Sequence, residues 1–277
     1  MSIQGKIKES EQYVEQSVIN CPKKYDETKR VLLIDADSIS YLSSYFPETS
    51  FLYFPTLKER QEECKYRIRN KLQEIQNNVE EWYNIISTIM FVGGKDNFRY
   101  KIYPEYKANR VKAVKPELLE YAKNYLIELG AIQSHGAEAD DYVIEAAKEV
   151  IENCVIATID KDLLYWGPNV PFYDYRTYKE TTGEFKAISD TERKWLKALQ
   201  LVSGDATDNI KGSPGIGLAY CKKNIFDTFT DYQYIKYIFI AYLKSYKNDY
   251  KLAKQQMKMN YKLLKLHTQE EIKELNL

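Results

Sequence analysis

The chain has 277 residues, 44% of them hydrophobic, and its formal net charge is zero. This length suffices for one large domain, or for a domain with a smaller appendage, and zero net charge argues against a simple polycationic nucleic-acid binder. No apolar run approaches the ~18 residues of a membrane span, and four scattered cysteines with two histidines favour neither a disulfide framework nor a zinc site. We therefore expect a reduced, cytoplasmic protein without a membrane partner.

Residues 1–30 carry no core pattern, and we expect them to form an N-terminal extension. The apolar run at 31–34 predicts the first buried strand. Residues 57–89 are charged and amphipathic and lack glycine and proline, which predicts a long helix. A second strand is expected at 89–92.

Residues 98–115 are dense in basic and aromatic side chains. Pro116 can open a helix that runs to about residue 129, and Gly130 is its expected cap. Before residue 190 we expect a short strand at 131–133, a helix at 138–152, a strand at 155–159 and an additional strand at 172–175. The remainder is predicted to be helical, except around 204–209 and 212–217.

Strands that alternate with helices predict an α/β fold, in which a mostly parallel central sheet carries helices on both faces. We divide the chain into the extension at 1–30, an α/β core at 31–190 and a helical region at 191–277. From residue 209 onwards there are 12 Lys and Arg against 6 Asp and Glu. This sorting of charge suits a phosphate-backbone ligand, although merely solvated lysines explain it equally well.

Acidic residues follow the predicted strands in clusters. The clusters are Asp35 and Asp37; Glu138, Asp140 and Asp141; Asp160 and Asp162; and Asp205 and Asp208. The carboxyl ends of parallel strands are where ligands collect, so we expect these side chains to converge. Crowded carboxylates stay ionised only with positive charge among them, and Mg²⁺ is a suitable partner. One such aspartate is usually a turn or cap residue, but four clusters indicate a metal-dependent enzyme acting on phosphates.

Six sequence pieces, in this order, resemble motifs of the 5′-nuclease family of phage-type 5′→3′ exonucleases and flap endonucleases. They are Leu-Ile-Asp-Ala-Asp (33–37), Pro-Glu-Tyr-Lys-Ala-Asn-Arg (104–110), Glu-Ala-Asp-Asp (138–141), Thr-Ile-Asp-Lys-Asp (158–162), Gly-Asp-Ala-Thr-Asp-Asn-Ile (204–210) and Gly-Ser-Pro-Gly-Ile-Gly (212–217). Their order and spacing match over about residues 31–226. The resemblance implies a PIN-like nuclease core, a helical arch around 98–128 and a helix–three-turn–helix in the C-terminal region.

The resemblance also implies two Mg²⁺ or Mn²⁺ ions. Asp35, Glu138, Asp140 and Asp141 would form the first site, and Asp160, Asp162, Asp205 and Asp208 the second. Lys107 and Arg110 would be catalytic, together with Asp141 and Asp160. If helical, the two basic residues share a face. The family has a further aspartate after its second strand, where this chain has Gly93 or Gly94. Asp37 lies beside this set of ligands. Asp96 could serve as a ligand in place of the missing aspartate, and His135 is expected to be incidental to the chemistry.

The expected DNA contacts fall in two segments. Arg99 and Lys101 would extend the basic wall, and Tyr106 could stack on a terminal base. The glycine-rich segment would grip duplex backbone and often holds a potassium ion in the family; its candidates are Lys211, Gly212, Ser213, Gly215, Gly217, Lys222 and Lys223. Taken alone, each segment has a plainer interpretation: a solvated helix face with a core tyrosine, and an ordinary turn between helices.

The favoured function is a divalent-metal-dependent 5′→3′ exonuclease on duplex DNA, with 5′ flaps and the RNA of RNA–DNA hybrids as further substrates. A flap-specific endonuclease and a PIN-like ribonuclease are the nearest alternatives. A catalytically inactive DNA-binding module is the alternative from another class. We expect a monomer.

Overall fold

The computed structural model describes residues 25–112, 114–151, 153–178 and 181–275. Within these residues the strands are β1 (Asp26–Asp35), β2 (Tyr83–Val92), β3 (Ile132–Gln133), β4 (Cys154–Ala157), β5 (Phe172–Tyr178) and β6 (Thr181–Lys186). They form one sheet in the order β3-β2-β1-β4-β5-β6. Every pairing is parallel except the antiparallel β5–β6 pair. The predicted mostly parallel α/β sheet is thereby confirmed.

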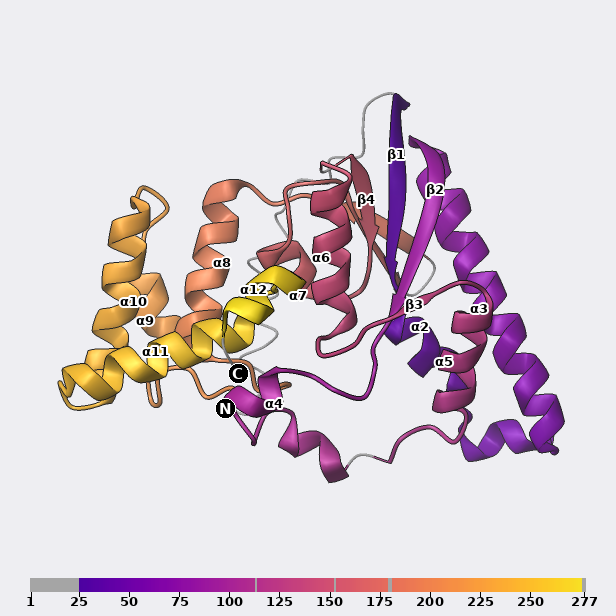
Figure 1. Ribbon diagram of the computed structural model, residues 1–277, viewed down its shortest axis with the longest axis horizontal. Coiled ribbons are helices and arrows are strands. Elements are labelled where there is room, and N and C mark those ends of the chain that lie inside the picture. Colours follow the sequence, from indigo (N-terminus) through magenta and orange to yellow (C-terminus); the bar gives the residue numbers. More distant parts are fainter. Residues whose placement is uncertain (1–24, 113, 152, 179–180, 276–277) are drawn as a thin grey trace.

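Helices cover the sheet and continue beyond it as a separate group at the C-terminal end (Figure 1). Around the sheet lie α2 (Asp37–Ser44), the 3-10 turn η1 (Glu48–Leu52), α3 (Leu57–Glu80), α5 (Leu119–Glu128), α6 (Ala139–Glu149) and α7 (Lys161–Trp166). The short α4 (Arg99–Ile102) and the 3-10 turn η2 (Ala108–Lys112) lie away from the sheet, and α4 contributes to the core of the C-terminal helices. The C-terminal group comprises α8 (Asp190–Ser203), α9 (Leu218–Asn224), α10 (Asp231–Ser245), α11 (Tyr250–Leu264) and α12 (Gln269–Glu274). None of the described helices combines the length and the apolar composition that crossing a bilayer would require.

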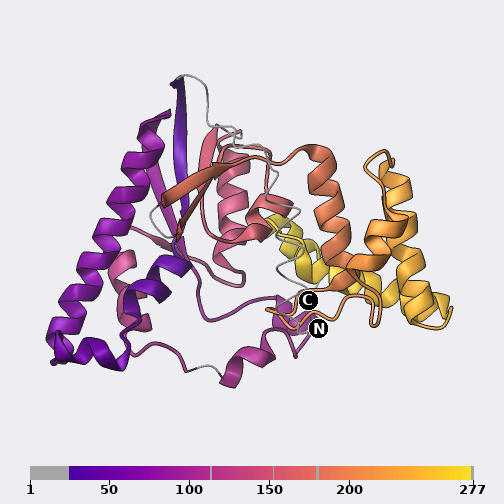
Figure 2. The ribbon, with the colours of Figure 1, turned by 180° about the vertical axis from the view of Figure 1, so that it is seen from behind.

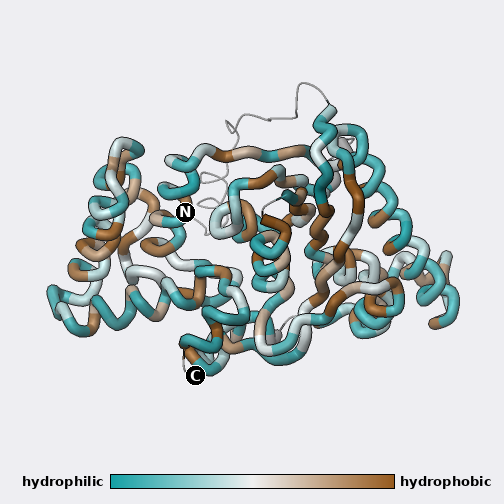
Figure 3. The backbone as a smooth tube through the Cα atoms, turned by 45° about the horizontal axis from the view of Figure 1, so that its top comes forward, coloured by the Kyte–Doolittle hydropathy of each residue, from teal (hydrophilic) through white to brown (hydrophobic). Residues whose placement is uncertain are grey.

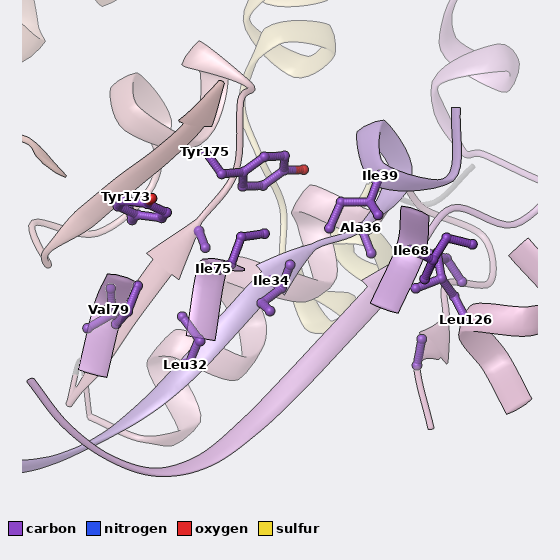
Figure 4. Packing of buried hydrophobic residues seen from close by; sticks show 14 of the residues in the cluster. Leu32, Ile34, Ala36, Ile39, Ile68, Ile75, Val79, Leu126, Tyr173 and Tyr175 are labelled. Atoms are coloured by element: carbon purple, nitrogen blue, oxygen red, sulfur yellow. The ribbon is translucent and has the colours of Figure 1, made fainter. Parts of the chain in front are cut away.

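The alternation of side chains along β1 builds a core on each face of the sheet. Leu32 and Ile34 pack in the cluster that includes α3 and α5, whereas Leu33 packs with α6 and α7. Figure 4 shows Leu32 and Ile34 facing side chains of α3, with Tyr173 and Tyr175 of β5 beside them. Because both faces are covered, the inner parts of the central strands, 31–34 in β1 and 154–157 in β4, are apolar. Figure 3 shows brown segments at the centre of the molecule.

The C-terminal helices have their own core, to which α8, α9, α10 and α11 all contribute. The starts of these helices are encoded locally. Thr230 forms a capping box with Gln233 at the start of α10, and the Asp249 side chain accepts a hydrogen bond from the third residue of α11. Seen from behind, the chain passes from β6 into α8 along one edge of the molecule (Figure 2).

Element boundaries differ from the sequence prediction in three places. Strand β1 begins at Asp26, so residues 26–30 belong to the sheet and not to an extension; the expected extension otherwise falls at 1–24, outside the described residues. Helix α3 ends at Glu80, and β2 already begins at Tyr83. Strand β6 was not predicted. Residues 26–30 are polar and lack the apolar signal of a buried strand, whereas β6 and the first half of β2 mix polar with apolar residues and give no clear strand pattern.

Candidate active site

A cavity of about 450 Å³ opens at the carboxyl ends of β1 and β4. Its lining includes eight carboxylates and five basic groups: Asp35, Asp37, Glu138, Asp140, Asp160, Asp162, Asp205, Asp208, Arg99, Lys107, Arg110, Lys123 and Lys161. Of the eight carboxylates predicted as metal ligands, seven line this cavity and Asp141 does not. Carboxylates up to 173 positions apart in sequence therefore share one pocket.

Neighbouring parallel strands bring Asp35 and Asp160 together. Asp35 is the last residue of β1, and Asp160 follows β4 as the N-cap of α7. Thr158 links the two, because its hydroxyl donates to Asp35 Oδ2 at 2.8 Å and accepts from the Asp160 N–H at 2.9 Å. The Tyr175 hydroxyl also donates to the Asp35 carbonyl at 2.7 Å. Neither Thr158 nor Tyr175 was singled out from sequence, although they stand within the fourth and fifth predicted strands.

Burial and mutual repulsion set the protonation of the acids. Burial, with the charges of Asp37 and Asp160, raises the pKa of Asp35 to about 7. Burial, with the charges of Asp160 and Asp205, raises the pKa of Asp162 to about 8, and burial beside Glu138 raises that of Asp140 well above its usual range. Glu138 behaves in the opposite way: burial opposes its charge, but Lys107 and Arg99 hold its pKa at about 2. Near neutral pH, further positive charge would therefore favour the ionised form of Asp35, Asp140 and Asp162.

Lys107 and Arg110 both reach the acids of the cavity. Lys107 Nζ hydrogen-bonds Glu138 and lies 3.7 Å from Asp208 Oδ2, while Arg110 Nη2 lies 2.5 Å from Asp208 Oδ1. The predicted shared helix face is wrong, because Lys107 has a φ of 55° and precedes η2. The two side chains converge on Asp208 from different backbone conformations. Lys161 adds a third cation, 3.7 Å from Asp205 Oδ2.

The lining suits a hard divalent cation by its chemistry. It offers carboxylate oxygens without histidine or cysteine, which is the donor set of Mg²⁺ or Mn²⁺. Across the residues that the structure describes, no three Asp, Glu, His or Cys side chains are already gathered around a single ion position. Basic side chains lie among the acids instead, and their ammonium and guanidinium groups form ion pairs with the carboxylates.

Asp141 has a structural role that the sequence did not reveal. Its side chain is fully buried, and Arg99 donates to both of its oxygens, at 2.6 and 2.9 Å. The backbone N–H groups of Glu138 and His267 donate to the same two oxygens, at 3.0 and 2.8 Å. Four donors saturate the carboxylate, so Asp141 is not placed as a ligand of the cavity. Arg99, 1% exposed, is likewise not part of a DNA-facing wall; its neighbour Lys101 is exposed.

Tyr106 also differs from expectation. Only 2% of the residue is exposed, and its hydroxyl lies 2.9 Å from Glu138 Oε2 and 2.8 Å from Asp208 Oδ2. A ring buried in this way cannot stack on a DNA base, so the predicted stacking is wrong. Its hydroxyl instead spaces two acids of the cavity, and burial beside Glu138 raises the pKa of the phenol far above its usual range.

Asp37, the first residue of α2, lies against Gly93. A Cβ on Gly93 would lie only 2.5 Å from Asp37 Oδ2, so residue 93 has no room for a side chain. Asp37 Oδ1 accepts the Gly93 N–H at 2.8 Å and lies 3.0 Å from Lys123 Nζ. Asp96 is not borrowed, because it accepts the Gly136 N–H and is not part of the cavity lining. The ring of His135 does not line the cavity either.

The glycine-rich segment after α8 lies outside the cavity. Gly212 has a φ of 63°, and a Cβ there would meet the Gly204 nitrogen at 2.3 Å, so this crossing requires glycine. The Ser213 N–H donates to the Val202 carbonyl at 2.7 Å, whereas its buried Oγ has no partner. The backbone continues through Gly215 and Gly217 into α9, on which two exposed lysines follow one another at 222 and 223. Lys211 is exposed as well.

Residues 30–191 match the family of the 5′-3′ exonuclease N-terminal, resolvase-like domain. The chain belongs to this 5′-3′ exonuclease family. The resemblance read from the six motifs is thereby confirmed, and the chain is assigned to the nucleases.

Individual relatives agree with this assignment. A 5′-3′ exonuclease of Buchnera aphidicola from Acyrthosiphon pisum is 26% identical over 255 residues, which cover 85% of this chain and 86% of that protein. DNA polymerase I of Rhizobium leguminosarum is 33% identical over 145 residues, which cover 47% of this chain but only 14% of the polymerase. The fold is similar to that of the bacteriophage T5 flap endonuclease, solved as a complex with DNA and metal ions: the TM-score is 0.58 at 18% identity, over 85% of this chain and 89% of that one.

Proposed function

We propose that the protein is a divalent-metal-dependent 5′→3′ exonuclease that hydrolyses phosphodiester bonds of duplex DNA. One observation carries this proposal: carboxylates from four separate sequence clusters meet two basic residues of the 104–110 motif in a single cavity. A network of structural ion pairs would not need acidic residues in such excess over basic residues in one place.

The carboxylates fall into two groups that would each hold a cation. Asp35, Glu138 and Asp140 form one group, with Asp37 beside it; Asp160, Asp162, Asp205 and Asp208 form the other. Bound divalent ions supply an activated water and neutralise charge on the phosphate and the leaving oxygen. The acids hold these ions, and Asp160 lies between the two groups.

Lys107 and Arg110 bind the phosphate whose ester bond is broken. Both side chains are cationic, and each forms an ion pair with an acid of the cavity, Lys107 with Glu138 and Arg110 with Asp208. Fixed positive groups aimed at a phosphoryl oxygen stabilise the charge that develops there. These two residues therefore contribute to turnover more than to the affinity for DNA.

The duplex is held by basic residues outside the cavity, on the exposed surface around α9 and on α4. Lys101, Lys211, Lys222 and Lys223 contact phosphates, and the Gly212–Gly217 turn, with the Ser213 hydroxyl, takes a potassium ion. Contacts of this kind ignore base sequence, so binding weakens steeply as salt rises. The same site accepts 5′ flaps and RNA–DNA hybrids, from which it would remove RNA primers, because the chemistry acts on the phosphate. A single polypeptide suffices, since the cavity is complete within one chain.

The test uses 5′-labelled duplex, flap and RNA–DNA hybrid, each with Mg²⁺, Mn²⁺ or EDTA. Wild type should release nucleotides from the 5′ end with either metal and none with EDTA. Asp160→Asn should bind DNA normally but cut at least about 10²-fold more slowly, because it removes charge from both groups of acids. Asp227→Asn, a change at an exposed acid outside the cavity lining, serves as the control. Wild-type cleavage by Asp160→Asn would refute the assignment, and a wild type that binds but never cuts would indicate an inactive DNA-binding module.

A further inference from the structure

Gln200 occupies a position among the acids that no motif predicted. It lies on α8, is 6% exposed, and its side-chain nitrogen faces two carboxylates at once. Nε2 lies 2.8 Å from Asp162 Oδ1 and 3.3 Å from Asp205 Oδ2. The two acids come from different elements, since one lies in the first turn of α7 and the other follows α8. The amide therefore spans the gap between two acids of the same proposed metal group.

Trp166 fixes the orientation of this amide. Its indole Nε1–H lies 2.6 Å from Gln200 Oε1 and can only donate, so the oxygen of the amide must face it. With the oxygen fixed in this way, the NH₂ group faces the two carboxylates. A flipped amide would place its oxygen against two acids and its nitrogen against an N–H, which loses all three hydrogen bonds. The network therefore has one satisfied arrangement.

A neutral amide acts differently from a basic side chain at this place. It donates one N–H to each carboxylate, which holds the two oxygens at a set separation. The amide is uncharged, so it does not neutralise the two carboxylates, and they still attract a cation. Lys161 lies 3.7 Å from the same oxygen of Asp205, but its side chain is 55% exposed, so it can move away when a cation binds. Buried Gln200 stays in place.

We propose that Gln200, oriented by Trp166, is a positioning residue that holds Asp162 and Asp205 at the separation needed to bind one divalent ion. This inference rests on the proposed metal-dependent function of the same cavity. Groups that hydrogen-bond metal ligands and orient them typically change metal affinity or activity by about 10–100-fold when removed.

The experiment compares wild type with Gln200→Met, which keeps the volume and helix propensity but has no donor. Mn²⁺ binding without DNA is measured by titration calorimetry, and DNA affinity is measured separately in EDTA. Gln200→Met should bind Mn²⁺ about 10–100-fold more weakly, with unchanged DNA affinity. Its kcat should fall at low Mn²⁺ and recover at high Mn²⁺, with KM for DNA unchanged. A purely structural role would not be rescued by metal.

Trp166→Phe and the double variant test the orientation. Trp166→Phe keeps the amide but frees it to rotate, so its Mn²⁺ binding should weaken to a smaller extent. Trp166→Phe with Gln200→Met should be no weaker than Gln200→Met alone, because the indole acts only through the amide. Additive losses would overturn the assigned role of Trp166. If Gln200→Met fails to fold by circular dichroism, wild-type Mn²⁺ affinity in Trp166→Phe overturns the proposal.

Gln73→Met is the matched control, since Gln73 is exposed on α3 and hydrogen-bonds only within that helix, to Asn77. It should match wild type in every measurement. If wild type binds Mn²⁺ and cuts DNA while Gln200→Met does both equally well, the role of Gln200 is refuted and the nuclease function stands. If wild type neither binds Mn²⁺ nor cuts, the proposed function fails, and the inference fails with it.

Discussion

Lys107 and Arg110 owe their positions to contacts between the 104–110 motif and the loop that carries Asp208. Lys107 adopts a left-handed φ of 55°, and its N–H donates to the Asp208 carbonyl at 3.0 Å. Asn109 and Arg110 also donate to carbonyls of the loop that carries Asp208. The basic motif and the acidic loop therefore hold one another through the main chain. This places the ammonium group of Lys107 among the acids without a long, flexible reach.

Replacing Lys107 by alanine should lower kcat by roughly 10²–10³-fold, the effect of removing one group that stabilises transition-state charge. DNA affinity should change little, because the phosphate contacts outside the cavity remain. Single-turnover cleavage and a separate binding assay in EDTA distinguish the two quantities. Lys101→Ala, a change at an exposed lysine outside the cavity lining, is the control for turnover. Equal losses of kcat and of affinity in Lys107→Ala would make Lys107 a simple backbone contact.

A buried arginine joins the C-terminal segment to the nuclease core at the level of elements. Arg99 begins α4, and its guanidinium binds Asp141 in α6 as well as the carbonyls of Leu263 and Lys265 at the end of α11. The His267 N–H completes the connection by donating to Asp141. Three elements far apart in sequence therefore meet at one ion pair beside the cavity.

Breaking this pair should destabilise the protein strongly. Arg99→Met leaves the buried Asp141 charge without its partner, and the free energy of unfolding should fall by about 3–5 kcal/mol. The double variant Arg99→Met with Asp141→Leu should recover part of that loss, because no buried charge then remains. Chemical denaturation gives these values, with Lys194→Met, which breaks an exposed pair with Asp231, as a near-neutral control. An Arg99→Met protein as stable as wild type would contradict the structural role of the pair.

Charge repulsion within the cavity affects the stability of the whole molecule. Burial and neighbouring acids raise the folded-state pKa of Asp35 to about 7 and that of Asp162 to about 8, from 3.8. The folded state therefore binds more protons than the unfolded state between these values, and its stability falls as pH rises through them. The pKa of His267 shifts in the opposite direction, since burial lowers it from 6.5. Its contribution to stability therefore rises with pH, but this rise takes place mainly below pH 6.5.

In EDTA, the thermal unfolding midpoint should therefore drop by several degrees between pH 6.5 and 8.5. Divalent ions should remove most of this drop, because they replace the protons as partners of the acids and stabilise only the folded state. Scanning calorimetry in EDTA and in Mg²⁺ at matched ionic strength measures both curves. Asp162→Asn in EDTA should show a smaller drop than wild type. Parallel curves with and without metal would show that the acids are not the source of the pH dependence.

Most of the elements, the order of the acidic clusters and the family were readable from the sequence, because local signals encode them. The apolar run at 31–34 predicts a covered strand by its composition alone, and six motifs in order identify the family. Polar strand ends such as 26–30 escaped, since backbone pairing with β2 makes them strands and leaves no apolar pattern.

Only the tertiary structure decided which acids remain available in the cavity. Asp140 and Asp141 are neighbours in one helical turn, yet the first lines the cavity and the second is saturated by Arg99 and His267. Tyr106 and Gln200 likewise hydrogen-bond to acids of the cavity because the tertiary fold brings them together. Whether a polar group is exposed or already hydrogen-bonded depends on contacts made 42, 102 or 126 positions away, and such long-range geometry has no local signature in the chain.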